Sequence, residues 1–252
     1  MTSRLLLLAL SLSAPLALAA CGSGNGNGDA NSTGPAAAPL AAVAAPAGKD
    51  WTQVVSKTAE GYVMGNPNAP IKLVEYGSRL CPACGAFARE GYEPLVNNYV
   101  KTGKVSWEFR EFLIHGAPDL PPALLGICAG EQTFFPLLEQ MYQSQQGFND
   151  KLQAMPPAMQ QQLQNAKPVD AIKAMAEQMD LINFVKQRGL PEAKARECLG
   201  NMLEIDRLTK QTQDRGADGT VTGTPTFILN GKPLKGAISW SDVQAALKNA
   251  GA

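Results

Sequence analysis

Histidine is nearly missing from this 252-residue chain, which holds only His115. A single imidazole excludes metal sites that need two histidine ligands, and it makes most hydrolase dyads depend on that one residue. Aromatic residues make up only 6% of the chain, and Lys plus Arg equal Asp plus Glu at 22 each. No positive excess is therefore available to neutralise nucleic-acid phosphates. We expect neither a nucleic-acid partner nor a metal or other cofactor.

The first twenty residues have the layout of a secretory signal peptide. Arg4 precedes an apolar run from Leu5 to Leu12, which is too short to span a membrane, and small residues follow. Leu18-Ala19-Ala20-Cys21 resembles the bacterial lipobox, which predicts cleavage before Cys21 and lipidation of its sulfur. Lipidation would also leave four of the five cysteines, an even number. The alternative is ordinary cleavage after Ala19, which would give a soluble exported protein.

Residues 22–49 consist mainly of Gly, Asn, Ser, Ala and Pro, with almost no large apolar residue. Such a stretch cannot bury a core, so the expected organisation is a signal peptide at 1–20, a lipid-anchored flexible linker at 21–49 and a folded domain at 50–252. Gly22 stands where aspartate signals inner-membrane retention in many Gram-negative bacteria. We therefore expect a periplasmic protein, anchored by lipid and sorted to the outer membrane.

The first half of the folded domain has the order strand, helix, strand. Ile71 to Tyr76 is a short apolar run after a turn-rich stretch, and residues 82–100 have apolar residues near helical spacing. Pro94 should kink or restart this helix. Apolar and polar residues then alternate from Val105 to Arg110, which predicts a half-buried strand.

A helical insertion is predicted between about residues 117 and 219, where Gln-, Met- and Ala-rich segments such as 169–179 and 191–210 show no convincing strand. Beyond it, residues 226–229 read as a strand, Asn230-Gly231 as a type I′ turn and residues 232–235 as the returning strand. A last helix should start near Ser239, with Asp242 as a capping residue.

The segment Cys81-Pro82-Ala83-Cys84 is the candidate reactive centre of the chain. A cysteine at the start of a helix sits where free N–H groups and the helix dipole favour a thiolate, the form that performs disulfide exchange. Pro82 suits the first helical position, and Cys84 lies one turn from Cys81, close enough to form a disulfide with it. Half of a structural zinc site or a purely structural disulfide remain alternatives, although Cys128, Cys198 and His115 form no second closely spaced pair.

A second motif, Gly223-Thr224-Pro225-Thr226-Phe227, looks like the cis-proline segment of the thioredoxin superfamily, which folds back against the C-x-x-C motif. With Glu75 six residues before Cys81 and the long helical insertion, the chain resembles the DsbA-type thiol-disulfide oxidoreductases, in their single-chain branch. The resemblance spans about residues 51–250. It implies a thioredoxin-like α/β fold with an inserted helical subdomain.

The resemblance also implies roles for individual residues. The bond between Thr224 and Pro225 should be cis and should expose the Thr224 backbone to an extended substrate beside Cys81. Glu75 matches a buried acid that relays the proton of the resolving cysteine. The alternatives are an ordinary turn at Pro225 and a solvated strand residue at Glu75.

One position departs from the commonest DsbA pattern, because Ala83 stands where a histidine usually stabilises the thiolate. Strong oxidising power is therefore in doubt.

Some relatives carry a second, structural disulfide in the insertion, which suggests that Cys128 pairs with Cys198; two buried free thiols are the alternative. We interpret His115 as a satisfied or exposed residue without chemical role. The methionines of the insertion are interpreted as helical core rather than a peptide groove or copper site: Met141, Met155, Met159, Met175 and Met179.

The sequence thus predicts a monomeric enzyme that exchanges disulfides with reduced or unfolded exported proteins, with Cys81 and Cys84 as catalytic pair and Pro82, Ala83 and Thr224 contacting substrate. Oxidation is the favoured direction, and the resemblance implies a quinone-linked membrane oxidase as the regenerating partner. A reductase or isomerase is one alternative. A copper-handling or assembly lipoprotein on a thioredoxin scaffold, without catalysis, is another.

Overall fold

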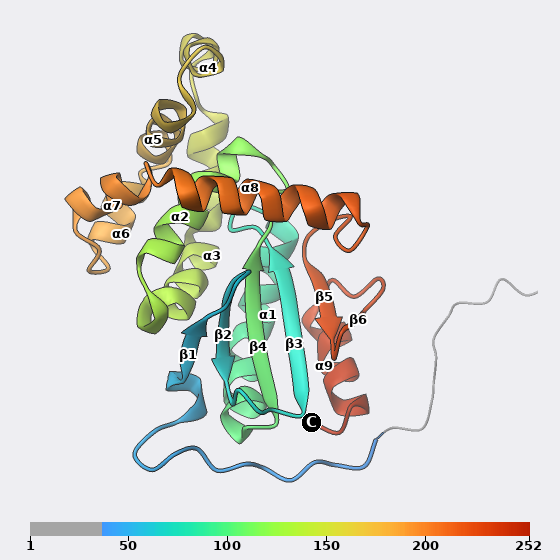
Figure 1. The fold of residues 1–252 in the computed structure, drawn as a ribbon. Coiled ribbons are helices and arrows are strands. Elements are labelled where there is room, and N and C mark those ends of the chain that lie inside the picture. Colours follow the sequence, from blue (N-terminus) through green and yellow to red (C-terminus); the bar gives the residue numbers. More distant parts are fainter. Residues whose placement is uncertain (1–36) are drawn as a thin grey trace, which may run out of the picture. The chain divides into compact units, whose positions relative to one another are not determined.

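The computed structural model describes residues 37–252, which contain one six-stranded sheet in the order β1-β2-β4-β3-β5-β6 (Figure 1). The neighbours β3 and β4 are parallel, and the other neighbouring pairs are antiparallel. The signal peptide, Cys21 and linker residues 22–36 lie outside the described residues. The strands are β1 (Val55–Lys57), β2 (Tyr62–Gly65), β3 (Ile71–Gly77), β4 (Val105–Glu111), β5 (Thr226–Leu229) and β6 (Lys232–Pro233).

The parallel pair β3 and β4 is joined by helix α1 (Pro82–Asn98), because parallel neighbours need a crossover connection. Both strands and the helix agree with the prediction. Leu73 and Phe109 point to one face of the sheet, where they share a buried core with Phe87 and Leu95 of α1. The helix runs through Pro94 without restarting, contrary to one of the two expected outcomes.

The strands β1 and β2 were not predicted. They are only three and four residues long, too short for a clear alternating pattern, and pairing with a neighbour holds them in place. In β2, Tyr62 lies opposite Phe109 of β4, and in β1, Val55 lies opposite Met64.

The predicted helical insertion begins after β4 and is made of seven helices, of 6 to 23 residues, within the part of the chain that the structure describes. The five methionines interpreted as helical core lie in or against a second core of buried apolar side chains, which agrees with that interpretation. The predicted helix at 191–210 is divided, because Asn201 caps a new helix by accepting a hydrogen bond from the Glu204 N–H. The helices are α2 (Leu120–Cys128), α3 (Glu131–Gln153), α4 (Pro157–Gln164), α5 (Pro168–Gln178), α6 (Leu181–Lys186), α7 (Glu192–Cys198) and α8 (Met202–Ala217), preceded by the 3-10 turn η3 (Ala117–Asp119).

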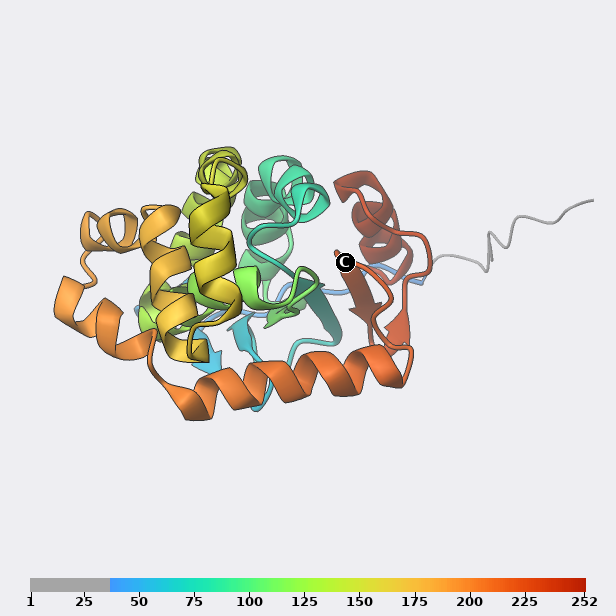
Figure 2. The ribbon, with the colours of Figure 1, turned by 90° about the horizontal axis from the view of Figure 1, so that it is seen from above.

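Helix α8 crosses the face of the sheet opposite to α1 (Figures 1 and 2). Among the described residues, no helix is both long and apolar enough to cross a membrane.

The carboxyl-terminal elements follow the sequence closely. Asn230 and Gly231 both have positive φ, at 49° and 78°, as a type I′ turn requires. The returning strand β6 is shorter than predicted and ends at Pro233, although the Leu234 N–H still donates to the Phe227 carbonyl at 2.9 Å. Helix α9 (Trp240–Asn249) begins with the expected capping box, in which Ser239 and Asp242 exchange hydrogen bonds.

The last part of the expected flexible linker is attached to the domain. Residues 37–49 form neither a helix nor a strand and contain a turn at residues 46–48, and the backbone N–H of Ala37 donates to the Asn249 carbonyl at 2.9 Å. The Val43 N–H donates to the Thr102 carbonyl at 2.9 Å, and its own carbonyl accepts from the Trp51 indole at 2.7 Å. The backbone of residues 37–49, which we expected to belong to the linker, is thus hydrogen-bonded to the domain at these points.

Candidate active site

The reactive segment lies between the end of β3 and the first turn of α1. Cys81 is the N-cap of α1, with extended backbone angles, and Pro82 occupies the first helical turn. The Gly85 N–H donates to the Cys81 carbonyl at 3.1 Å, which fixes the first turn. Cys84 follows on that turn and is fully buried, whereas Cys81 is 7% exposed. The outer cysteine is therefore the one that a partner can reach.

The two thiols have opposite electrostatic environments. The pKa of Cys81 is lowered to about 5, chiefly by a hydrogen bond from the Cys84 thiol, then by Thr224 and by the backbone N–H groups of Cys84 and Ala83, against the opposing effect of burial. The pKa of Cys84 is raised well above its ordinary value, first by burial and then by donating to Cys81. At neutral pH Cys81 is the thiolate and Cys84 is the thiol.

Thr224 faces Cys81 from the loop before β5. The Thr224–Pro225 bond is cis, as expected. The protonated Cys81 thiol donates to the Thr224 carbonyl at 3.3 Å, which a thiolate cannot do. The Thr224 hydroxyl is buried without a hydrogen-bond partner, and it is a donor that the thiolate can use. The two motifs, 143 residues apart in sequence, thus meet at one sulfur atom.

Glu75 lies on β3 and faces α1, not solvent. It is 1% exposed, between Phe109 of β4 and Phe227 of β5. Burial raises the pKa of this carboxyl to about 8, the nearby Cys81 thiolate adds to the effect, and the Trp107 indole opposes it. Neither carboxyl oxygen accepts a hydrogen bond. The geometry excludes the solvated alternative and leaves a carboxyl that is largely protonated at neutral pH.

Two residues of the helical insertion hold the reactive turn, and no sequence pattern indicated them. The Gln145 amide donates to the Arg79 carbonyl at 3.0 Å and to the Cys81 carbonyl at 2.8 Å. One helical turn later, Asn149 donates to the Leu80 carbonyl at 3.1 Å. A glutamine on a helix usually reads as a solvated residue, so only the tertiary arrangement reveals this contact.

Below the turn lies a buried ion pair. The Arg79 Nε donates to the Glu111 carboxylate at 2.8 Å, and both side chains are almost completely buried. The guanidinium packs 5.0 Å from the centre of the Phe134 ring. A Cβ at Gly126 would collide with the guanidinium, so helix α2 can approach only because this position is glycine.

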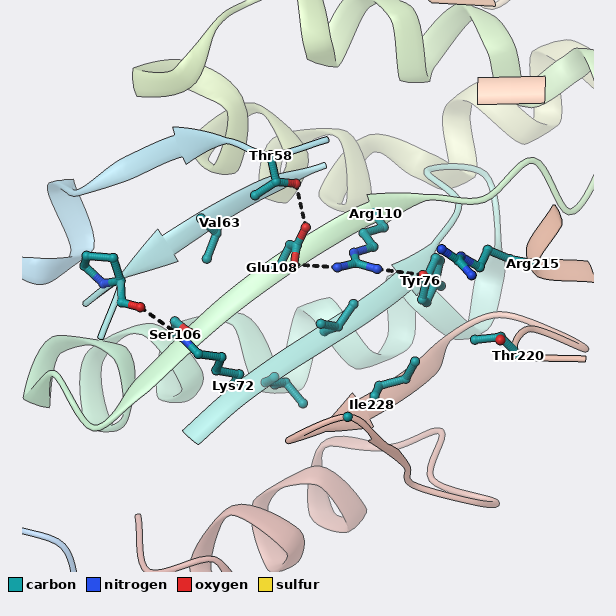
Figure 3. Close-up of a pocket in the computed structure, with 14 residues that line it drawn as sticks. Thr58, Val63, Lys72, Tyr76, Ser106, Glu108, Arg110, Arg215, Thr220 and Ile228 are labelled. Carbon is teal, nitrogen blue, oxygen red and sulfur yellow. Dashed lines mark hydrogen bonds and ion pairs between the residues drawn. The ribbon is translucent and has the colours of Figure 1, made fainter. Parts of the chain in front are cut away.

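Of two large hollows beside the sheet, one borders Thr224, which contacts Cys81. A hollow of about 520 Å³ borders Thr224, Pro225 and the loop up to Ile238. A second, of about 550 Å³, lies on the sheet face opposite to α1, and Cys81 and Cys84 do not line it (Figure 3). Its Arg110 is engaged with Glu60, Glu108 and the Tyr76 hydroxyl, and its Arg215 with Glu60. These charges are paired with one another, which is the pattern of a structural network.

The remaining cysteines lie in the insertion, at the ends of α2 and α7. Cys128 and Cys198 are joined by a disulfide with their Cα atoms 6.1 Å apart. Within residues 37–252, no three His, Cys, Asp or Glu side chains are grouped as metal ligands.

Several known proteins are similar to this chain in sequence. The thioredoxin family model matches residues 57–249. "Disulfide bond formation protein D" of Bacillus subtilis is 22% identical over 187 residues, which cover 74% of this chain and 75% of that protein. A Rickettsia felis relative is 24% identical over 172 residues, 67% of this chain but only 52% of its own length. The chain thus spans about half the length of the rickettsial relatives.

Solved structures agree with the sequence relatives. A protein-disulfide isomerase from Novosphingobium aromaticivorans is 28% identical, with a TM-score of 0.71 over 75% of this chain and 97% of that one. Wolbachia pipientis α-DsbA1 shares the fold at 21% identity, with a TM-score of 0.52 over 66% of this chain and 73% of that one. The chain belongs to the thioredoxin family, and its fold is the DsbA-like form of it, with helices inserted between β4 and β5.

Proposed function

We propose that this protein is a thiol-disulfide oxidoreductase that transfers its Cys81–Cys84 disulfide to exported proteins. The observation that carries the proposal is the contrast between a Cys81 pKa of about 5 and a Cys84 pKa raised by burial. A stabilised thiolate favours the reduced form of the pair, and a pair that favours its reduced form is an oxidant. The exchange chemistry is also the one named for the Bacillus and Novosphingobium proteins.

The reaction proceeds in two exchanges. A client thiolate attacks the Cys81 sulfur, the outer one of the disulfide, the bond to Cys84 breaks, and the electron pair leaves with Cys84, which takes up a proton. A second client thiolate then attacks the client sulfur of the mixed disulfide, and Cys81 leaves as a thiolate. The client gains one disulfide, and the two electrons remain in the Cys81/Cys84 dithiol.

Two neighbouring groups support these steps. Glu75, whose pKa is raised to about 8, is a carboxylic acid beneath the pair that can supply the proton to Cys84. Thr224 lies against Cys81 on the border of the 520 Å³ hollow, where an extended client segment would run beside the sulfur. Pro82 and Ala83, which follow Cys81 in sequence, would contact the same client segment.

The enzyme must be reoxidised after each reaction, and its location decides which partner can do this. We propose that lipidated Cys21 anchors the protein in the periplasm, at the outer membrane, and that it works as a monomer. A membrane oxidase linked to quinones would accept the two electrons and restore the disulfide. The lipobox-like sequence Leu18-Ala19-Ala20-Cys21 supports the anchor.

Isomerisation is a second candidate, favoured by the likeness to the Novosphingobium protein-disulfide isomerase. The reduction potential of the Cys81/Cys84 pair in glutathione buffers separates an oxidant from a reductase. Oxidation of a reduced model protein, compared with rearrangement of a scrambled one, separates net oxidation from isomerisation. We expect a potential above about −200 mV and net oxidation. A potential near about −270 mV, as in thioredoxin, would assign a reductase instead. Copper and zinc analysis of the purified protein tests the metal-handling alternative.

A further inference from the structure

The Cys81 thiolate lacks a nearby cationic side chain within its own motif. Ala83 contributes only its backbone N–H, and the other stabilising groups are the Cys84 thiol and Thr224. The sole histidine of the chain lies in the loop between β4 and η3, with 42% of its side chain exposed. We expected no chemical role for it, and its contacts argue otherwise.

His115 is held by a buried carboxylate. Its ring Nδ1 lies 3.0 Å from Oδ1 of Asp119, and its backbone N–H donates to Oδ2 of the same residue at 2.7 Å. Asp119 itself is only 2% exposed. Two contacts from one residue to one carboxylate fix the ring orientation, engage Nδ1 and leave Nε2 free of this contact.

The same carboxylate is attached to the reactive turn. The Ser78 hydroxyl donates to Oδ1 of Asp119 at 2.7 Å and accepts from the Leu80 N–H at 3.1 Å. The Ser78 carbonyl accepts from the Cys81 N–H at 3.1 Å. A continuous chain of hydrogen bonds thus runs from Cys81 through Ser78 and Asp119 to His115. The chain couples the position of the His115 ring to that of the reactive turn.

The charges around the ring come from two elements. Asp119 of η3 raises the pKa of His115 through its hydrogen bond, and Cys81 before α1 adds a smaller charge interaction in the same direction. A protonated His115 therefore offsets the negative charge of Asp119 near the turn. A neutral or missing His115 would leave Asp119 as an uncompensated anion, which opposes a thiolate nearby.

We propose that His115, oriented by Asp119, provides in its protonated form the positive charge that favours the Cys81 thiolate, in place of a histidine at position 83. The proposal rests on the proposed function, since it concerns the same sulfur. It makes Asp119 and Ser78 positioning residues for His115. It also makes the thiolate sensitive to pH in the range where histidine titrates.

The test compares His115→Gln, His115→Lys and the remote surface control Lys186→Gln. The Cys81 pKa is read from the ultraviolet absorbance of the thiolate in the reduced protein, at low ionic strength. We expect His115→Gln to raise the Cys81 pKa by about half a unit, a threefold loss of acidity, and to weaken the reduced form relative to the disulfide. His115→Lys should restore acidity, and Lys186→Gln should leave it unchanged.

Because His115 is exposed, His115→Gln should fold, and urea unfolding of each variant verifies this. An unchanged Cys81 pKa in folded His115→Gln would overturn the proposal, as would failure of His115→Lys to restore it. Asp119→Asn, which keeps the shape, should lower the raised Cys81 pKa of His115→Gln again, because it removes the uncompensated anion. The readout does not depend on client oxidation: a shifted Cys81 pKa in a protein that oxidises no client would reject the proposed function and keep this inference.

Discussion

Gln145 donates a hydrogen bond to the carbonyl of Cys81 at 2.8 Å, across 64 residues of sequence. The same amide nitrogen also donates to the Arg79 carbonyl. The insertion that distinguishes this domain from a plain thioredoxin fold therefore contacts the reactive turn directly. Its helices fix the geometry of the site as well as covering it.

Replacing Gln145 by Ala should leave two buried carbonyl groups without this donor. We expect a loss of about 1–3 kcal/mol in the free energy of unfolding, measured with urea. The neighbouring Gln146 is exposed and serves as a matched control, so Gln146→Ala should change stability by less than about 0.5 kcal/mol. If both variants lost the same free energy of unfolding, the hydrogen bonds of the Gln145 amide would not stabilise the fold.

Trapping of mixed disulfides with clients tests the different roles of Cys81 and Cys84. Cys84→Ala should accumulate mixed disulfides with clients, because no resolving thiol remains to release Cys81. Cys81→Ala should not, because the remaining thiol is fully buried. Non-reducing electrophoresis followed by mass spectrometry detects the complexes. Comparable trapping by both variants would refute the assignment.

Glu75 should make the stability of the oxidised protein fall as pH rises. Burial is the largest cause that raises the Glu75 pKa above the ordinary 4.5, and burial remains in the oxidised protein, so the folded state holds the proton more tightly than the unfolded state. The resulting stabilisation is complete below about pH 4.5 and is lost as pH rises through the raised pKa of the folded state. The oxidised form is used because Cys81 does not titrate in it.

Glu75→Gln should remove this pH dependence and stabilise the protein above pH 7, by on the order of a few kcal/mol. Urea unfolding at a series of pH values measures it, with the exposed Glu90→Gln as control. If wild type and Glu75→Gln kept the same pH slope, Glu75 would not be the buried acid described above.

Ala83→His should strengthen the oxidant. A donor near the Cys81 sulfur is worth about 1 to 1.5 kcal/mol if it acts as a charge-assisted hydrogen bond. Because 1.4 kcal/mol corresponds to about 30 mV for a two-electron couple, the reduction potential should rise by roughly 20 to 30 mV. The Cys81 pKa should fall at the same time. A potential that stays constant would indicate that residue 83 does not face the sulfur.

The disulfide of the insertion should stabilise the fold without taking part in exchange. It closes a loop with a sequence separation of 70 residues, worth roughly 4 kcal/mol at most in the chain-entropy model. Cys128→Ala together with Cys198→Ala should lower the free energy of unfolding and leave disulfide exchange in place. In wild type, thiol blocking without reductant should preserve a linked peptide. Alkylation of both residues would reject the pairing.

Local signals in the sequence were sufficient for the main elements of the site. Pro82 after Cys81 marks the start of α1, and the alternation from Val105 to Arg110 marks β4. The cis bond before Pro225 and its position beside Cys81 followed from the resemblance of two motifs, because no local pattern specifies a contact over 143 residues.

What sequence could not reveal depends on tertiary partners. The strand β1 exists because Val55–Lys57 pairs with β2, and three residues carry no periodicity of their own. Gln145 and Arg79 look like ordinary surface residues until the fold places carbonyl groups, Glu111 and Phe134 around them. A polar residue that belongs to a buried hydrogen-bond network leaves no hydrophobic pattern in the sequence by which it could be recognised.

The attachment of residues 37–49 fixes the end from which the domain is held. Ala37 and Val43 bond near the carboxyl end of α9 and just before β4, whereas Cys81 follows the opposite end of the parallel strands (Figure 1). The described chain therefore enters the domain at the end of the sheet remote from the reactive sulfur. If the proposed anchor at Cys21 holds, the chain that leads to it leaves from that remote end, and the Cys81 end of the sheet is free for clients.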